Sequence, residues 1–552
     1  LPHTDLSKVS AKLEKESNLT KYALIGGVAI LVGILFFVFQ EEEETVPSIA
    51  IIPLENKGES KDEFYSYSIS ADLISDVSGA GDIRVASLKD IEKLDYKSLS
   101  NDEIAKKLFV RYISQGTLWK VDSIFQLSME LYDTKKNKVQ WSKNWQQNWS
   151  ELPSIKGGLS GNILTNLQVT TKQDITKSES ENAEAYAMYL QAKNIYQKRE
   201  NVDDREIAQT LLNKAIKLDE NLIAAKVLLG DLYIDVSDFD EAMEIYSSAL
   251  TKSKELDDRL WIGRSTRKIG RIFHFDKLDL DTALDYYERA LAIAEEIGDK
   301  AGMGASLSNI GNLYNINKGD YEKALEYFDR SLVIVEEMGD NQFMGKVLGN
   351  IGLVHKNKDD YDKALEYQSR SLAIAEEIGD KTNVGKNNKV IGDMYSYKGD
   401  YDTALDYYER ALAIAEEMGD KFGMFILLNE IGGMYGDKGE YDKALGYYKR
   451  MLESTKEYGD KLFIGYSLTC IGFVDYKKES YEKALEQLEQ SLAIQKEIGF
   501  KELELETTTY LYLTYKHLGK DYDVNEIHSL IKETANLEFE LNYTFYALYE
   551  LL

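Results

Sequence analysis

The stretch GDYDTALDYYERALAIAEEMGDK (residues 399–421) decides the fold, because related stretches recur along the chain with the same spacing of small and large residues. Each copy follows a glycine, and these glycines are 40 or 41 residues apart: Gly230, Gly270, Gly311, Gly352, Gly392, Gly432 and Gly472. Within each copy, an alanine and a large residue four positions later share one face of a helix. The large residues are Tyr246, Tyr287, Phe328, Gln368, Tyr408, Tyr448 and Leu488, and Gln368 is the exception to the aromatic or aliphatic rule.

This spacing resembles the tetratricopeptide repeat over about residues 184–500. The resemblance implies a mostly α fold, in which residues 184–552 form an α-solenoid of eight repeats and a degenerate ninth. One unit alone cannot bury its apolar faces, so neighbouring units stack and leave a concave groove lined by the first helix of each pair. The phrase EEIGDK (376–381) recurs between units, and its glycine and aspartate suit a helix end and the next helix start.

The groove is the expected binding surface. In the resembling family, inward-facing positions lie six and three residues before the glycine and one and four residues after it. Basic residues dominate these positions in the middle repeats, although the chain carries a net charge of −29. The candidate groove residues are Arg264, Arg267, Arg271, His274, Asn312, Asn315, Lys346, Lys356, Lys386, Lys389, Tyr466, Phe473 and Tyr476.

Such a groove suits a protein partner or an acidic peptide with an apolar portion. The alternative is that the bases pair with neighbouring acids and keep the array soluble. The two-carboxylate clamp known in the family is not reproduced, because Asn312 fits one of its places but Gly349 and Leu353 do not.

The amino-terminal region predicts a membrane anchor. Tyr22–Phe39 is an uninterrupted run of apolar or glycine residues, just long enough to span a bilayer. Four lysines precede it, so the positive-inside rule places a cytoplasmic linker at 1–20, a transmembrane helix at 21–40 and an acidic linker at 41–47, with the remainder outside the bacterial inner membrane. Small residues in the helix also allow a homodimer (Gly26, Ala29 and Gly33).

Residues 48–170 predict a small α/β domain, followed by a linker at 171–183. Strands are expected at 48–56, 83–87, 111–121, 125–134 and 138–145, and helices at 64–77, 101–110 and 151–168. The domain resembles the TolB-like amino-terminal domain that precedes tetratricopeptide repeats in bacterial signalling proteins. Residues that carry the resemblance include Pro53, Asn56, Arg84, Gly116 and Asp133.

Several classes of site are absent from the sequence. The excess of acid, 95 acidic against 66 basic side chains, argues against nucleic-acid binding. The five histidines and single cysteine have no metal-ligand spacing, and no phosphate-binding loop or paired catalytic group is found. We therefore expect no cofactor, no metal and no catalytic residue in these 552 residues.

Three functions fit these patterns. The first is a membrane-anchored interaction or sensor module of bacterial signal transduction. The second rests on resemblance: in class III adenylate/guanylate cyclases of this architecture a catalytic domain precedes the membrane helix, and residues 1–17 look similar to the linker after it. The chain would then be the regulatory half of such a cyclase, with the enzyme upstream of residue 1. The third function is an envelope assembly scaffold.

Overall fold

The computed structural model describes residues 46–80, 83–171, 178–198 and 202–534. From Ser48 onward these residues belong to one compact unit. The predicted membrane segment at 21–40 lies outside the described residues. Within the described ranges, no helix is both long and apolar enough to cross a bilayer.

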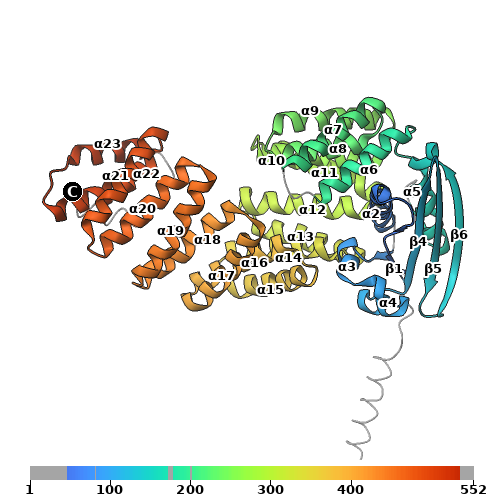
Figure 1. The fold of residues 1–552 in the computed structure, drawn as a ribbon, viewed down its shortest axis with the longest axis horizontal. Helices are drawn as coiled ribbons and strands as arrows, with labels where there is room; N and C mark the ends of the chain where they lie inside the picture. Colours follow the sequence, from blue (N-terminus) through green and yellow to red (C-terminus); the bar gives the residue numbers. More distant parts are fainter. Residues whose placement is uncertain (1–45, 81–82, 172–177, 199–201, 535–552) are drawn as a thin grey trace, which may run out of the picture. The chain divides into compact units, whose positions relative to one another are not determined.

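The amino-terminal domain is a sheet covered by helices (Figure 1). Its elements are β1 (Ser48–Ile51), β2 (Glu55–Asn56), α2 (Glu63–Gly79), β3 (Arg84–Val85), α3 (Leu88–Lys93), α4 (Asn101–Leu108), β4 (Tyr112–Val121), β5 (Ile124–Asp133), β6 (Lys138–Asn148) and α5 (Leu152–Asn166). The strand order is β3-β1-β4-β5-β6, and β2 also pairs with β4. β1 is parallel to β3 and β4, whereas β4, β5 and β6 are antiparallel. The predicted α/β region is confirmed, although the strand predicted at 48–56 is divided into β1 and β2 and α3 was not predicted.

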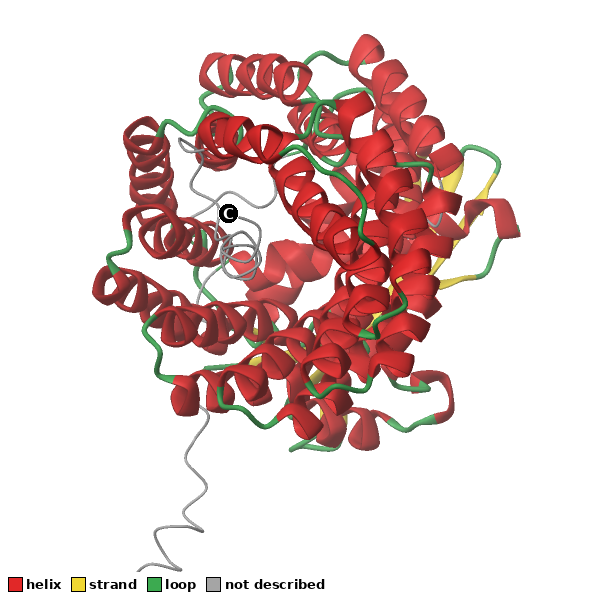
Figure 2. Cartoon of the chain, turned by 90° about the vertical axis from the view of Figure 1, so that its left-hand side faces the viewer, coloured by secondary structure: helices red, strands yellow, loops and turns green. Residues whose placement is uncertain are grey.

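The remaining described residues form paired helices. They are α6 (Ala183–Lys198), α7 (Val202–Leu218), α8 (Ile223–Ile234), α9 (Phe239–Glu255), α10 (Arg259–Phe275), α11 (Leu280–Ile297), α12 (Lys300–Leu313), the π-helical η4 (Tyr314–Lys318), α13 (Tyr321–Met338), α14 (Asn341–Asn357), α15 (Tyr361–Glu377), α16 (Lys381–Tyr397), α17 (Tyr401–Met418), α18 (Lys421–Asp437), α19 (Tyr441–Tyr458), α20 (Lys461–Lys477), α21 (Tyr481–Ile498), α22 (Lys501–Leu518) and α23 (Val524–Thr534). Figure 2 shows that helices make up most of the chain and that strands are confined to one domain. The predicted mostly α solenoid is confirmed.

A close contact between a glycine and a ring holds most of the helix pairs together. A Cβ atom at Gly392 would lie 2.7 Å from Cε1 of Tyr408, and one at Gly432 would lie 2.6 Å from Cε1 of Tyr448. Real Cβ atoms do not approach other atoms so closely, so only glycine lets the two helices meet at this separation. The helix joints also follow the sequence pattern: Gly419 ends α17 with a φ of 67°, and the Asp420 carboxylate accepts a 2.9 Å hydrogen bond from Gly423 N at the start of α18.

Ion pairs connect successive repeats on the outside of the array. In one series, a lysine at the end of a repeat's first helix meets an acid at the start of the preceding repeat's second helix: Lys277–Asp240, Lys318–Asp281, Lys358–Glu322, Lys398–Asp362, Lys438–Asp402 and Lys478–Asp442. A second series joins the start of a repeat's first helix to the end of its own second helix: Arg259–Glu296, Lys300–Glu337, Lys381–Glu417, Lys421–Glu457 and Lys461–Glu497. Most of these carboxylates are exposed, so each pair contributes little stability. The pairs mainly explain why charged residues recur at the same positions of successive repeats.

The second series is interrupted where the α/β domain touches the repeats. Asn341 stands where most of the other repeats have a lysine or arginine, and its Nδ2 donates a 3.0 Å hydrogen bond to Oδ2 of Asp90 in α3. Nearby, Lys93 Nζ donates a 2.9 Å hydrogen bond to the Glu376 carbonyl oxygen. The α/β domain therefore contacts the two joints that precede α14 and α16.

Buried charges join the α/β domain to the first repeat. Lys156 of α5 is 5% exposed, and its Nζ lies 3.2 Å from Asp76 Oδ2 and 2.6 Å from Glu179 Oε1. Burial raises the pKa of Asp76 to about 6, although Lys156 opposes this rise. The folded protein therefore retains a proton on Asp76 at pH values where the unfolded chain has lost it.

This raised pKa predicts a pH dependence of folding stability. The stabilisation from Asp76 is fully present below about pH 4 and is lost as the pH rises through about 6. We expect Asp76→Asn to gain roughly 2–3 kcal/mol relative to the wild type between pH 4 and pH 7. Urea denaturation of both proteins across this range measures the difference. A constant difference in unfolding free energy would contradict the prediction.

Candidate functional site: a pocket between repeats

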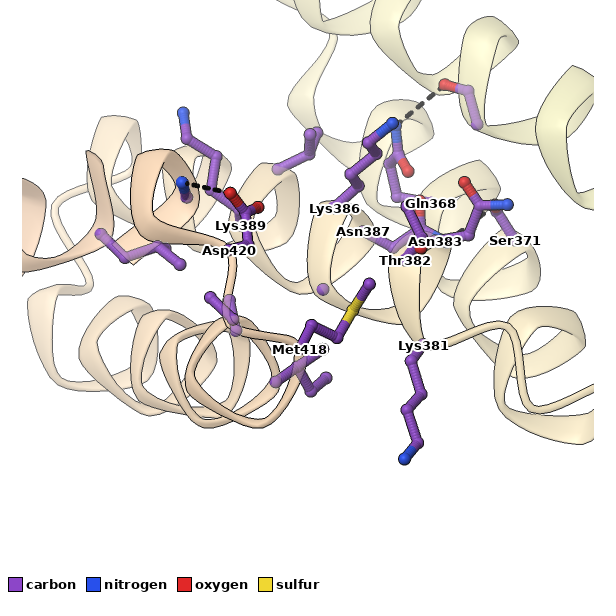
Figure 3. Close-up of a pocket in the computed structure, with 18 of the residues that line it drawn as sticks. Gln368, Ser371, Lys381, Thr382, Asn383, Lys386, Asn387, Lys389, Met418 and Asp420 are labelled. Carbon is purple, nitrogen blue, oxygen red and sulfur yellow. Dashed lines mark hydrogen bonds between the residues drawn. The ribbon is translucent and has the colours of Figure 1, made fainter. Parts of the chain in front are cut away.

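An apolar opening in the array lies over α14 to α18. It has a volume of about 630 Å³, within the range of small-ligand sites. Figure 3 shows its polar side chains from α15 and α16 facing Met418 at the end of α17. Its main lining residues are Gly345, Lys346, Gly349, Leu353, Gln368, Ser371, Gly385, Lys386, Asn387, Lys389, Ile414, Met418, Phe422 and Ile426. We call this the Gln368 pocket.

The pocket exists where the repeat pattern is broken. In the other repeats a tyrosine, phenylalanine or leucine packs over the glycine of the first helix, as Tyr408 does over Gly392. In the pocket's repeat, Gln368 takes this place, and its Cγ would lie 2.9 Å from a Cβ at Gly352. The Gln368 side chain ends in an amide and has no ring, so the space that a ring fills in most of the other repeats stays open here. Gly349 adds to the opening, because the equivalent position carries Arg267, Ser308, Lys389, Asn429 or Thr469 in other repeats.

Hydrogen bonds organise the floor of the pocket. Asn387 Nδ2 donates to Ser371 Oγ at 2.9 Å, and Ser371 Oγ donates to the Gly345 carbonyl oxygen at 2.7 Å. Gln368 Nε2 donates to the Gly349 carbonyl oxygen at 2.9 Å. These bonds fix which end of each side-chain amide is nitrogen and which is oxygen.

The rim of the pocket is basic. Lys346 and Lys386 are exposed, and neither has an ion-pair partner among the described residues. Lys389 differs, because its Nζ lies 2.9 Å from Asp393 Oδ2. Lys381 also touches the pocket, but its side chain extends away from it in Figure 3 and pairs with Glu417 at 2.6 Å. Two uncompensated positive charges therefore face the opening.

The opposite wall is apolar. It is built by Ile414 and Met418 of α17 and by Phe422 and Ile426 of α18. Met418 is 47% exposed and Phe422 is 56% exposed, so both offer apolar surface at the opening. The pocket thus combines a polar floor, a basic rim and an apolar wall.

The structure brings together only part of the candidate set. Lys346, Lys386 and Lys389 line the pocket. Lys356 lies outside the lining and contacts Asp393 at 3.2 Å. Asp393 also accepts a 2.9 Å hydrogen bond from the Tyr408 hydroxyl. Its carboxylate is therefore shared by Lys356, Lys389 and Tyr408. Burial and this carboxylate raise the pKa of Tyr408.

The candidates in α10 and α12 lie elsewhere. Arg264 and Arg267 border a crevice of only about 10 Å³, and Arg264 is 3.7 Å from Asp299. Burial and the neighbouring Arg264 and Arg271 lower the pKa of Arg267. His274 and Asn315 are buried and hydrogen bonded within the array, to Asn317 and Asn357 respectively. Asn312 is half-buried on α12.

The aromatic candidates of α20 pack against other rings. Tyr466 contacts Phe425, Phe473 contacts Tyr510, and Tyr476 contacts Tyr510 as well. Each is partly buried against a neighbouring core cluster. They lie outside the pocket.

Sequence reasoning missed the floor and the wall of the pocket. Gln368, Ser371, Ile414 and Met418 belong to second helices, whereas the predicted groove used first-helix positions alone. The departure of Gln368 from the repeat pattern was the signal that could have found it. Without a ring at position 368, space remains between the first helices α14 and α16. Side chains of the second helix α15, which lies behind them, then line the pocket.

A second cavity, of about 770 Å³, lies in the α/β domain beyond the carboxyl end of β1. Its charged lining is mostly acidic: Glu55, Glu63, Glu92 and Glu130, with Lys97 as the one lysine. In the part of the chain that the structure describes, no three histidine, cysteine, aspartate or glutamate side chains are grouped closely enough to hold a metal ion.

The tetratricopeptide-repeat family matches residues 221–296, 273–337, 343–417 and 423–499. The helices from α8 to α21 are therefore tetratricopeptide repeats, and the Gln368 pocket lies within them. No curated protein matches the chain.

Among solved structures, the chain is similar to a signal transduction ATPase with numerous domains from Pyrococcus horikoshii, which has a tetratricopeptide-repeat sensor. The identity is 19%, the TM-score is 0.51, and the match covers 69% of this chain but only 56% of that protein. This likeness shows the fold alone.

Two weaker likenesses are to the apo form of the quorum sensor NprR from B. thuringiensis and to a Rap protein complexed with competence and sporulation factor. For NprR the identity is 17%, the TM-score is 0.40, and coverage is 60% of this chain and 98% of that one. For the Rap protein the identity is 16%, the TM-score is 0.39, and coverage is 61% of this chain and 99% of that one. Nothing about this chain follows from these two. Its repeat array is a protein-interaction module of the tetratricopeptide type.

The shared carboxylate at the pocket's edge predicts a large stability effect. We expect Asp393→Ala to cost roughly 3 kcal/mol, because it leaves Lys356, Lys389 and the Tyr408 hydroxyl without their partner. Asp362→Ala is the matched control, because Asp362 makes the same kind of pair with Lys398 but its side chain is 88% exposed. Urea denaturation compares the two. Equal midpoints would show that Asp393 has no special role.

Proposed function

We propose that this protein is a membrane-anchored interaction module of bacterial signal transduction, and that its Gln368 pocket holds an acidic peptide or a protein segment with an apolar portion. The observation that carries the proposal is the pair Lys346 and Lys386. Both are exposed and uncompensated, although the chain's net charge is −29 and most array lysines are paired. They stand at the rim of a pocket whose other wall is apolar.

Charge complementarity selects the partner. An acidic segment that approaches this chain is repelled by most of its surface, because acids outnumber bases. At the pocket, the two lysines attract a carboxylate while Met418 and Phe422 offer apolar area to a neighbouring side chain. The same groups suit neither a nucleic acid, which needs a wide basic surface, nor a basic peptide.

Charge reversal tests this proposal. We expect Lys346→Glu with Lys386→Glu to weaken binding of a synthetic acidic nonapeptide, containing leucine and phenylalanine, by at least about 10-fold at low salt. Fluorescence anisotropy with the full chain in detergent micelles measures the affinity. Lys398→Glu is the control, because Lys398 lies just beyond the same helix but pairs with Asp362 outside the pocket. If the double variant binds as tightly as the control, the pocket is not the binding site.

The membrane anchor is part of the proposal. It is supported by the apolar run Tyr22–Phe39 and by the lysines that precede it. We expect the protein to remain in bacterial inner membranes after alkaline carbonate extraction and to be released when residues 21–40 are deleted. Protease digestion of spheroplasts should reach the repeats. Release of the intact protein by carbonate would contradict anchoring, and pairing through Gly26, Ala29 and Gly33 would fail with it.

A second candidate function is the regulatory half of a class III adenylate/guanylate cyclase. It is supported by the order of segments, an α/β domain that resembles the TolB-like domain followed by tetratricopeptide repeats, and by the likeness of residues 1–17 to the linker after the cyclase domain. The coding sequence upstream of Leu1 tests it, since a cyclase domain there would join the pocket to an enzyme. An envelope assembly scaffold is the third candidate, and it predicts a structural envelope protein as the partner.

A further inference from the structure

Two buried side-chain amide oxygens lie at the floor of the Gln368 pocket. Gln368 is 1% exposed, and its Oε1 accepts no hydrogen bond from the described residues. A Cβ atom built on Gly349 would lie 3.3 Å from Ser371 Oγ and 3.8 Å from both Gln368 Oε1 and Asn387 Oδ1. The two amide oxygens therefore converge on the space above Gly349.

This orientation is set by the protein's own hydrogen bonds. The Gln368 amide nitrogen donates to the Gly349 carbonyl oxygen, and the Asn387 amide nitrogen donates to Ser371 Oγ. Neither amide can exchange the positions of its nitrogen and oxygen without losing its bond. The floor thus offers two fixed acceptors, one of them buried and unmatched, which costs free energy until a donor arrives.

We propose that this floor binds the side-chain carboxamide of an asparagine or glutamine in the bound peptide. A carboxamide nitrogen has two hydrogens, which matches the two facing oxygens. A carboxylate would be repelled by these oxygens, and an aliphatic side chain would leave Gln368 Oε1 unmatched. An ammonium group is disfavoured because Lys346, Lys386 and Lys389 surround the opening.

The site is particular to this repeat. Where other repeats have Tyr287, Phe328 or Tyr408, the ring fills the corresponding space and leaves no carboxamide acceptor. Gly349 leaves the space in front of these buried oxygens without a side chain, whereas a lysine or asparagine at the equivalent position would fill it. The specificity of the whole array for its peptide would therefore depend on one pocket.

This inference rests on the proposed peptide-binding function, and one set of probes separates the two. The probes are synthetic acidic nonapeptides with leucine and phenylalanine, in which each position in turn carries asparagine, aspartate or leucine, three side chains of nearly equal size. They are titrated into the full chain in detergent micelles. We expect one position at which asparagine binds about 10-fold or more tightly than either substitute.

Two variants assign that preference to the floor. Gln368→Leu removes the acceptor at nearly constant size, and Gln368→Tyr restores the residue found in most other repeats, so both should fold. We expect both to lose the preference for asparagine, with no fall in melting temperature for Gln368→Tyr. Gln490→Leu, the same change on an exposed face of α21, should keep it.

Each outcome is decisive. If asparagine, aspartate and leucine bind equally to the wild type at every position, or if Gln368→Leu keeps the preference, the carboxamide site is refuted while peptide binding stands. If no peptide of the set binds at all, the peptide-binding function is refuted and this inference falls with it.

Discussion

The architecture depends on the contact, in most repeats, between a glycine on the first helix and a ring on the second. The ring lies where a Cβ atom would be, so the two helices pack at a separation that no larger residue permits. Repetition of this contact sets the spacing of the array, and the glycine and aspartate at each joint set the direction of the next helix. The outer ion pairs follow from that spacing, because residues 36 or 37 positions apart then meet, either across neighbouring repeats or between the two helices of one repeat.

Because the contact between a glycine and a large apolar side chain recurs along the array, its replacement at Gln368 changes the local packing. Replacing the ring by Gln368 removes apolar volume and adds an amide that must find partners. Its nitrogen finds one in the Gly349 carbonyl, but its oxygen does not. Together with Gly349, this leaves a cavity with a polar floor at the centre of an array that is otherwise closely packed. A position that weakens packing in this way is more easily explained by binding than by folding.

Charge is distributed according to the same geometry. Many array lysines pair with nearby acids, within a repeat or across to the next one. Lys346 and Lys386 are exceptions, and both border the cavity. The α/β domain touches the joints that precede α14 and α16, the two helices that carry these lysines. A ligand between α14 and α16 would therefore bind close to contacts between α3 and the array.

The sequence by itself determined the repeat, its helix pairs, their caps and the α/β order of residues 48–170, because these depend on local spacing and on periodic burial. It also singled out Gln368 and the basic positions of α14 and α16. The tertiary structure alone decided which of those positions share a surface. Arg264, Arg267 and His274 follow the same spacing rule as Lys346 and Lys386, yet neighbouring acids, crowding and burial occupy them. The physical reason is that spacing fixes the face of a helix, whereas an open cavity requires the absence of a side chain on the helix behind it.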